Sequence, residues 1–176
     1  DEINRAYEVG WVGNDRVAFI GDTLSNSGEK VPELFIVDLP KDEQGWKHAG
    51  SEPLEGTAEK MPAPPAGVVQ RRLTSTHQKR FPGLVNVPRH WVRSHPQAKE
   101  IAFLMRDDNG VVQLWLIAPE GGEPRQLTQN ASDIQSAFNW HPSGDALGFV
   151  LENRIALADS HTGKVTFLTS DHGNPP

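Results

Sequence analysis

The chain has 176 residues, carries 17 Lys and Arg against 23 Asp and Glu for a formal net charge of −6, and contains no cysteine. The negative charge argues against a nucleic-acid-binding surface, which needs clustered cations, and the lack of cysteine excludes disulfides and cysteine metal sites. Apolar runs such as 101–105 are much shorter than the roughly 20 residues of a membrane-spanning helix, so no membrane span is expected.

The first repeating unit is expected at 5–74. Runs rich in Val, Ile, Phe and Leu at 16–22, 33–40 and 67–74 are bounded by Gly, Pro, Asn and Asp, a pattern that is typical of strands joined by turns. The opening run 5–12 is expected to be the innermost strand of this unit, and a helical turn is the alternative.

An inserted loop is expected at 41–66, inside the first unit. This segment contains Pro, Gly, Glu and Lys without periodicity, and loops of this length are either functional or poorly ordered. It contains Trp46, the one Trp that we expect to be exposed. Trp46 is therefore the candidate for a partner contact, and a loop anchor is the alternative.

The second unit at 84–128 and the third at 133–169 repeat each other. Residues 94–104 align without gaps on 140–150, and residues 111–128 align on 152–169. All three units close on Leu-Thr, at 73–74, 127–128 and 168–169, and Asn109-Gly110 favours a two-residue hairpin turn. Because four short strands in about 40 to 45 residues is the period of a propeller blade, the sequence predicts an all-β, partial β-propeller of about three consecutive four-stranded antiparallel blades.

A cationic segment runs from the end of the first unit into the predicted innermost strand of the second unit, which carries Arg89, His90 and Arg93. Residues 61–98 contain no Asp or Glu but six Lys and Arg. We predict that His90, with Arg89 and Arg93, faces the central channel and binds a small anionic ligand; the alternative is a polar inner strand that faces water. A single histidine is not a metal site, since such a site needs three or four converging ligands, so no metal or other cofactor is expected.

The repeat also resembles a known family. A His-Pro pair followed by an apolar strand with Phe, a Gly turn and Leu-Thr resembles the WD40-like repeat of TolB-type propellers. The segments DEINRAYEVGWVGN, PGLVNVPRHWVRSHP and IQSAFNWHPSGDALGFV resemble the uncharacterised bacterial YidR-type proteins, whose longer chains have propeller repeats on both sides of this region. The resemblance implies that residues 1–176 are a fragment of one β-propeller domain.

The expected function is a non-catalytic binding scaffold for a protein or a small ligand. No nucleophile motif and no phosphate-binding glycine loop is present, and the fragment alone is not expected to be active. The alternative is part of a carbohydrate-lyase-like propeller enzyme that acts on an anionic sugar such as oligogalacturonate. That alternative rests on a distant resemblance to oligogalacturonate lyases, which bind a metal through histidines near the channel. A divalent metal is expected only if this alternative function is correct. A cytoplasmic location is favoured, and a periplasmic one stays open.

Association of two copies is also expected. Three blades would leave two sheet faces bare, and the exposed side chains are expected to come from Phe19, Phe35, Ile36, Phe149 and Leu157. Because soluble monomers rarely tolerate large apolar patches, the sequence predicts a homodimer of this fragment.

Overall fold

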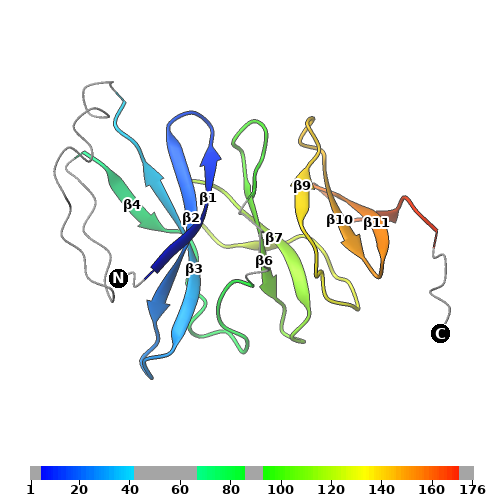
Figure 1. Ribbon diagram of the computed structural model, residues 1–176, viewed down its shortest axis with the longest axis horizontal. Coiled ribbons are helices and arrows are strands. Elements are labelled where there is room, and N and C mark those ends of the chain that lie inside the picture. Colours follow the sequence, from blue (N-terminus) through cyan, green and yellow to red (C-terminus); the bar gives the residue numbers. More distant parts are fainter. Residues whose placement is uncertain (1–4, 42–66, 86–92, 171–176) are drawn as a thin grey trace.

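The structure, a computed structural model, describes residues 5–41, 67–85 and 93–170. These residues form three four-stranded antiparallel sheets, and no helix occurs among them (Figure 1). The prediction of an all-β fold with three consecutive four-stranded blades is confirmed.

Each sheet pairs its strands in chain order. The first sheet contains β1 (Arg5–Val12), β2 (Arg16–Leu24), β3 (Lys30–Asp38) and β4 (Val69–Arg72). The second contains β5 (Arg93–Ser94), β6 (Ile101–Arg106), β7 (Val112–Ile117) and β8 (Arg125–Gln126). The third contains β9 (Phe138–Trp140), β10 (Ala146–Leu151), β11 (Arg154–Asp159) and β12 (Val165–Phe167).

The first strands of the three sheets are neighbours, since β1 contacts β5 and β5 contacts β9. The sheets lie side by side along the long axis of the molecule, with the first sheet in blue to blue-green, the second in green and the third in yellow to red (Figure 1). Residues 5–12, for which the sequence predicts a strand with a helical turn as the alternative, form strand β1. This strand is extended along most of its length and pairs with β2.

The inserted loop that the sequence predicts lies almost entirely outside the described residues, and the predicted two-residue turn needs correction. Residues 42–66, which make up nearly all of the expected inserted loop, and Trp46 within it lie outside the described residues. The turn at Asn109-Gly110 joins β6 and β7 as a hairpin, but the connection runs over 107–111 and not over two residues. The side chain of Asp107 stabilises it, because Asp107 Oδ1 accepts hydrogen bonds from the amides of Asn109 at 2.9 Å and Val111 at 3.0 Å.

Apolar side chains fill the spaces between successive sheets. Ile20, Leu34 and Leu73 of the first sheet and its closing segment pack with Phe103 and Trp115 of the second. On the other side of the second sheet, residues Leu104, Leu114 and Leu127 pack with residues of the third, among them Leu147 and Phe149. All six residues of β7 are consequently buried, as expected of a strand covered on both faces.

The prediction of which apolar residues are exposed is wrong for four of the five named side chains. Ile36 and Phe149 are buried between sheets. Phe19 and Phe35, which are register partners on β2 and β3, stack with ring centroids 5.4 Å apart and are only 5% and 2% exposed. Leu157 is half-buried. The homodimer itself remains a prediction, and Phe19, Phe35 and Ile36 do not supply the bare apolar face on which it was based. The exposed apolar side chains of β1 are instead Val9 and Trp11, at 60% and 57%, so the expectation that Trp46 is the one exposed Trp is wrong.

The closing Leu-Thr pairs have one structural role in all three sheets. The threonine hydroxyl accepts a hydrogen bond from a backbone amide of the third strand: Leu34 to Thr74 at 2.8 Å, Leu114 to Thr128 at 3.0 Å and Ile155 to Thr169 at 3.0 Å. Each hydroxyl thus replaces a ladder partner where the last strand ends, so the repeated Thr closes the sheet.

Candidate functional site

Of the predicted ligand-binding residues, the structure describes only Arg93. Arg93 lies at the start of β5, with its side chain half-buried, and its carbonyl accepts a hydrogen bond of 2.9 Å from Trp140 Nε1 on β9. Arg89 and His90 lie outside the described residues. The anion site of Arg89, His90 and Arg93 therefore stays a prediction, with Arg93 placed at the junction of the second and third sheets.

A residue that the sequence analysis did not single out, Glu8, interrupts the innermost strand β1. The register of β1 on β2 shifts between Tyr7 and Gly10, so Glu8 and Val9 face a single partner position, Phe19. Two residues opposite one define a β-bulge, which bends the strand and re-aims a side chain. Glu8 has φ = 60°, a left-handed conformation that is uncommon for a residue with a Cβ.

The carboxylate of Glu8 is partly buried without a hydrogen-bond donor, among the described residues, for one of its two oxygens. Burial raises the pKa of Glu8 above its ordinary value, because removal from water disfavours the charged form. Oε2 is buried, and no hydrogen-bond donor reaches it from the part of the chain that the structure describes. Backbone strain, a raised pKa and an unsatisfied polar atom are each more frequent at functional sites than elsewhere, and Glu8 combines all three.

A cavity of about 460 Å³ lies on the third sheet. The connection from β8 to β9, the end of β10 and the β10–β11 turn line it, and the lining residues are Ser132, Asp133, Gln135, Ser136, Val150, Glu152 and Asn153. Hydroxyls, amides and two carboxylates dominate this lining, and none of its residues is Lys or Arg. The cavity therefore favours neutral or cationic hydrogen-bonding groups over anions.

Local hydrogen bonds shape this cavity. Ser136 Oγ accepts from the amide of Val150 at 2.8 Å, which holds the connection against β10. Ser132 Oγ donates to Glu152 Oε1 at 2.9 Å, and Arg154 donates to Glu152 Oε2 at 2.6 Å. These two bonds, that from Ser132 first, lower the pKa of Glu152, so its carboxylate is charged at neutral pH. In the repeat alignment Ser136 occupies the position of His90.

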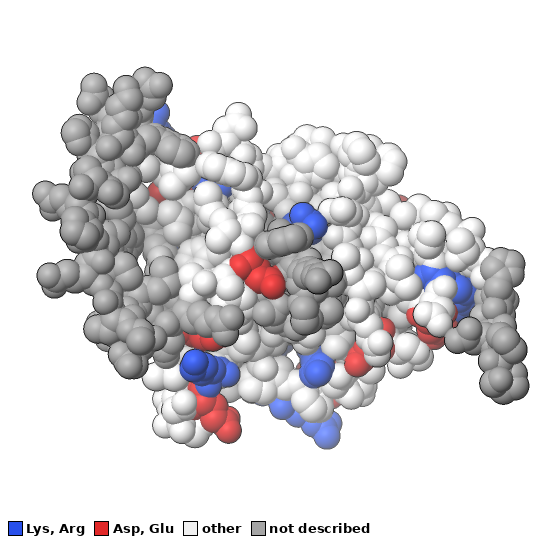
Figure 2. Space-filling model, viewed as in Figure 1, with Lys and Arg blue, Asp and Glu red and all other residues white. Residues whose placement is uncertain are grey.

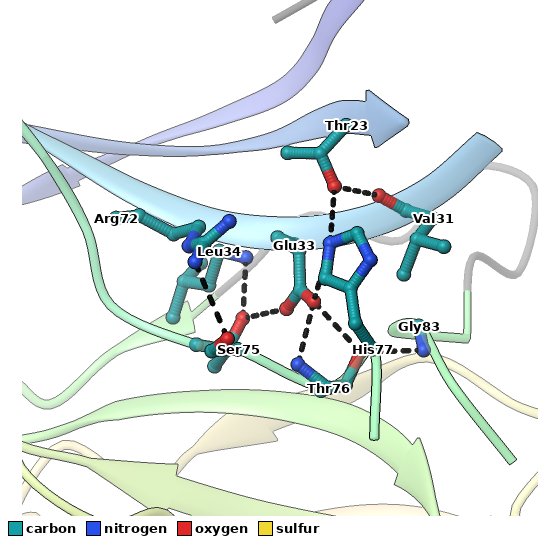
Figure 3. A network of polar contacts seen from close by, with 10 residues as sticks. Thr23, Val31, Glu33, Leu34, Arg72, Ser75, Thr76, His77 and Gly83 are labelled. Carbon is teal, nitrogen blue, oxygen red and sulfur yellow. Dashed lines mark hydrogen bonds and ion pairs between the residues drawn. The ribbon is translucent and has the colours of Figure 1, made fainter. Parts of the chain in front are cut away.

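A second polar cluster surrounds Glu33, which is fully buried on β3 (Figure 3). Its Oε2 accepts from Thr74 Oγ1 at 2.5 Å, and its Oε1 accepts from the amide and the hydroxyl of Thr76 at 2.6 and 2.8 Å. His77 Nε2 lies 3.8 Å from Glu33 Oε1 and 2.9 Å from Thr23 Oγ1. The buried carboxylate thus has three hydrogen-bond donors.

The second sheet shows that the Glu33 cluster is structural. Gln113 precedes Leu114 as Glu33 precedes Leu34, is also fully buried, and accepts from Thr128 Oγ1 at 2.8 Å and from the amide of Asn130 at 3.1 Å. A neutral amide fulfils the same role in the next repeat. The negative charge is thus not required there, and Glu33 serves to fix the segment after the Leu-Thr pair.

Outside these clusters, the charged side chains and the potential metal-ligating side chains of the described residues are scattered over the surface. On the face shown in Figure 2, acidic and basic side chains alternate along one edge, outside the grey atoms, and the opposite edge is largely uncharged. Within 5–41, 67–85 and 93–170, no group of three or more His, Asp or Glu residues is arranged to hold a metal ion. The same ranges contain no helix that is long and apolar enough to cross a membrane.

Sequence reasoning missed Glu8 and the cavity for different reasons. Gly10 inside an expected strand is a signal for a bulge, and it stands two residues after Glu8. The cavity had a weaker signal. Glu152 and Asn153 form the β10–β11 turn with positive φ angles of 51° and 58°, and only Asn153 is a residue type that favours such a turn.

Comparison with known proteins identifies a relative over the whole chain. The chain is 72% identical over 176 residues to the uncharacterised protein YidR of Escherichia coli K12. The alignment covers all of this chain and 42% of that protein. The chain thus spans less than half the length of this curated relative. A scan against protein-family models finds no match.

Solved structures show the same fold at low sequence identity. A TolB-type structure from Agrobacterium tumefaciens aligns with a TM-score of 0.56 and 19% identity over 94% of this chain and 49% of its own. TolB from Acinetobacter baumannii aligns with a TM-score of 0.44 and 17% identity, over 94% of this chain and 43% of its own. The first of these supports the fold; neither identifies a ligand.

Proposed function

We propose that this chain, which belongs to the YidR-type proteins and has a TolB-like β-propeller fold, is part of one propeller domain that acts as a non-catalytic binding scaffold. Its binding surface is the edge formed by the adjacent first strands β1, β5 and β9. The partner is a protein or a small ligand.

The observation that carries this proposal is Glu8. An ionisable side chain with a buried, unsatisfied oxygen destabilises the free protein unless the group is neutral or a donor reaches it. A ligand that presents an ammonium or amide donor would satisfy Oε2 on binding. Glu8 lies on β1, next to β5, which carries Arg93, so the same edge presents groups of both charges.

The proposal is tested by titration calorimetry with three probes: a short lysine peptide, a neutral oligosaccharide and trigalacturonate. We expect the lysine peptide to bind, and Glu8→Gln to weaken this binding by about tenfold or more, since hydrogen bonds to charged groups contribute about 1.5 to 3 kcal/mol. The matched control is Glu29→Gln, because Glu29 is an exposed Glu on the β2–β3 connection.

The pH dependence adds a second criterion. The pKa of Glu8 is raised in the free protein, so a cationic probe should bind more tightly as the pH rises through that pKa and the carboxylate becomes charged. In Glu8→Gln this dependence should vanish. Binding of the lysine peptide that is equal in both variants would contradict the proposal. Preferential binding of trigalacturonate would instead favour the anion site predicted at Arg89, His90 and Arg93.

A further inference from the structure

At the cavity of the third sheet, the connection from β8 to β9 bonds to β10 through a side chain and not through its main chain. Ser136 Oγ accepts a hydrogen bond from the amide of Val150 at 2.8 Å and donates to the carbonyl of Val150 at 3.1 Å. One hydroxyl thus occupies both main-chain groups of Val150. The serine side chain stands between the connection and β10, where a paired strand would bring its backbone.

The second sheet joins the same two segments by main-chain pairing. Leu84 and Ile134 occupy equivalent positions, since both are buried and the amide of each donates to the third strand of the preceding sheet, at 2.9 and 3.1 Å. Leu84 forms a β-bridge with Met105, and the amide of the next residue, Val85, donates to the carbonyl of Leu104 at 2.8 Å. The space at the third sheet therefore arises where a serine hydroxyl replaces this direct pairing.

The neighbouring turn is covered in the second sheet and open in the third. Phe81 packs against the turn from β6 to β7, where a Cβ on Gly110 would lie 3.0 Å from the Phe81 ring. The shorter connection from β8 to β9 contains no aromatic residue before Phe138, and Glu152 and Asn153 of the β10–β11 turn are exposed. The cavity of about 460 Å³ lies beside this uncovered turn.

Three polar groups of the cavity lining have no hydrogen-bond partner within the part of the chain that the structure describes. They are the side-chain amides of Gln135 and Asn153 and Oδ2 of Asp133, whose Oδ1 accepts from the amide of Val112 at 2.8 Å. The remaining polar side chains of the lining bond to one another, to Arg154 or to the main chain. Two primary amides and one carboxylate oxygen are thus available to a ligand.

These groups match a ligand that both donates and accepts hydrogen bonds. A primary amide offers two donors and an acceptor, whereas a carboxylate oxygen only accepts. A cation would satisfy the carboxylate and leave the amide donors unpaired, and an anion would meet two carboxylates without a Lys or Arg in the lining. A hydroxyl group donates and accepts at once, so a compound with several hydroxyl groups and no charge fits best.

We propose that this cavity binds an uncharged saccharide, whose hydroxyl groups bond to Gln135, Asn153 and Asp133. The volume of about 460 Å³ lies within the range of roughly 300 to 1,000 Å³ that small-molecule sites occupy. Glu8 is not among the lining residues, so this site is separate from the one proposed on the edge of β1, β5 and β9 and does not depend on it.

The test is an NMR titration that follows the backbone amide signals of the chain. The probes are maltose, cellobiose and lactose, with spermidine as the cationic and trigalacturonate as the anionic alternative. Asn153→Gly removes one amide and keeps the turn, because residue 153 has φ = 58°, which glycine adopts readily. Gln135→Ala removes the other amide. The matched controls are Asn109→Gly in the β6–β7 turn and Gln97→Ala, both at exposed positions outside the cavity.

At least one of the three disaccharides should shift the signals of residues 132–136 and 150–153 and saturate in the millimolar range. Asn153→Gly and Gln135→Ala should each weaken this binding by about threefold to tenfold, the loss expected for one neutral hydrogen bond. The two controls and Glu8→Gln should leave it unchanged, which separates this site from the one at Glu8.

Three results would overturn the proposal. The first is that none of the three disaccharides shifts the signals of residues 132–136 and 150–153 at millimolar concentrations. The second is that spermidine or trigalacturonate binds more tightly at these residues, which would assign the cavity to a charged ligand. The third is disaccharide binding that the double variant of Asn153→Gly and Gln135→Ala leaves unchanged.

Discussion

The second and third sheets are built from aligned residues, but their neighbours differ. Leu114 is fully buried and Ile155, its repeat partner, is 50% exposed. His95 is buried, its ring 4.8 Å from that of Trp140 in an edge contact, whereas His141 at the same repeat position is exposed and contacts Ser143. The energetic role of a repeat residue thus depends on whether another sheet covers it, which mutations at paired positions can measure.

The largest difference is expected between Leu114→Ala and Ile155→Ala. Leu114→Ala removes a fully buried side chain and should lower the free energy of unfolding by about 2 to 5 kcal/mol, through lost burial and the cavity left behind. Ile155→Ala should cost less than about 1 kcal/mol. Urea unfolding of both variants measures this. Similar losses would show that Ile155 is covered in solution by an element that the structure does not contain.

The threonines of the closing Leu-Thr pairs give a smaller difference in stability between the second and third sheets. Thr128→Val leaves the amide of Leu114 and Oε1 of Gln113 without their hydroxyl partner, and both residues are fully buried. The expected cost is about 1 to 3 kcal/mol. Thr169→Val exposes the amide of Ile155 to water, which can replace the hydroxyl, so its effect should stay within about 0.5 kcal/mol. Equal effects in urea unfolding would mean that water does not reach the amide of Ile155.

The smallest effect concerns His95 and pH. Burial, followed by the charge of Lys99, lowers the pKa of His95 below its ordinary value of 6.5. The unfolded chain therefore binds the proton more tightly than the folded one, and His95 reduces stability as the pH falls from 6.5 toward its lowered pKa. Stability should consequently fall less in His95→Gln than in the natural sequence over this range.

Thermal unfolding at several pH values below neutrality measures this effect, and His141→Gln serves as the matched control. The prediction would be contradicted if His95→Gln lost stability with falling pH as steeply as the natural sequence does. Such a result would mean that the buried ring accepts a proton in the folded state without a penalty.

Much of the fold followed from local sequence. Turn residues between β-branched and aromatic runs predicted the strands, and the two gap-free alignments predicted that the second and third sheets repeat each other. The Leu-Thr pairs marked the end of each unit, although the reason for the threonine, a hydroxyl that accepts from the third strand, required the structure. Repetition makes such predictions reliable because the same local contacts recur in each unit.

The candidate site was harder to predict. Arg89, His90 and Arg93 were chosen because they are cationic and lie on an expected inner strand, and Arg93 is the only one whose place the structure describes. Glu8 could not be recognised from its residue type. A bulge arises from how β1 pairs with β2, and the unsatisfied oxygen arises from what surrounds it, so neither is a property of the local sequence.

The sequence by itself determined the strands, their turns and the three repeated units, because hydrophobic period and turn chemistry act over a few residues. Only the tertiary structure decided which apolar faces are covered. Phe19 and Phe35 were expected to be exposed and are buried, whereas Val150, Ile155 and Leu168 have the composition of core residues and contact solvent. Burial depends on the element that packs against a side chain, and residues of one sheet do not specify whether that element is present.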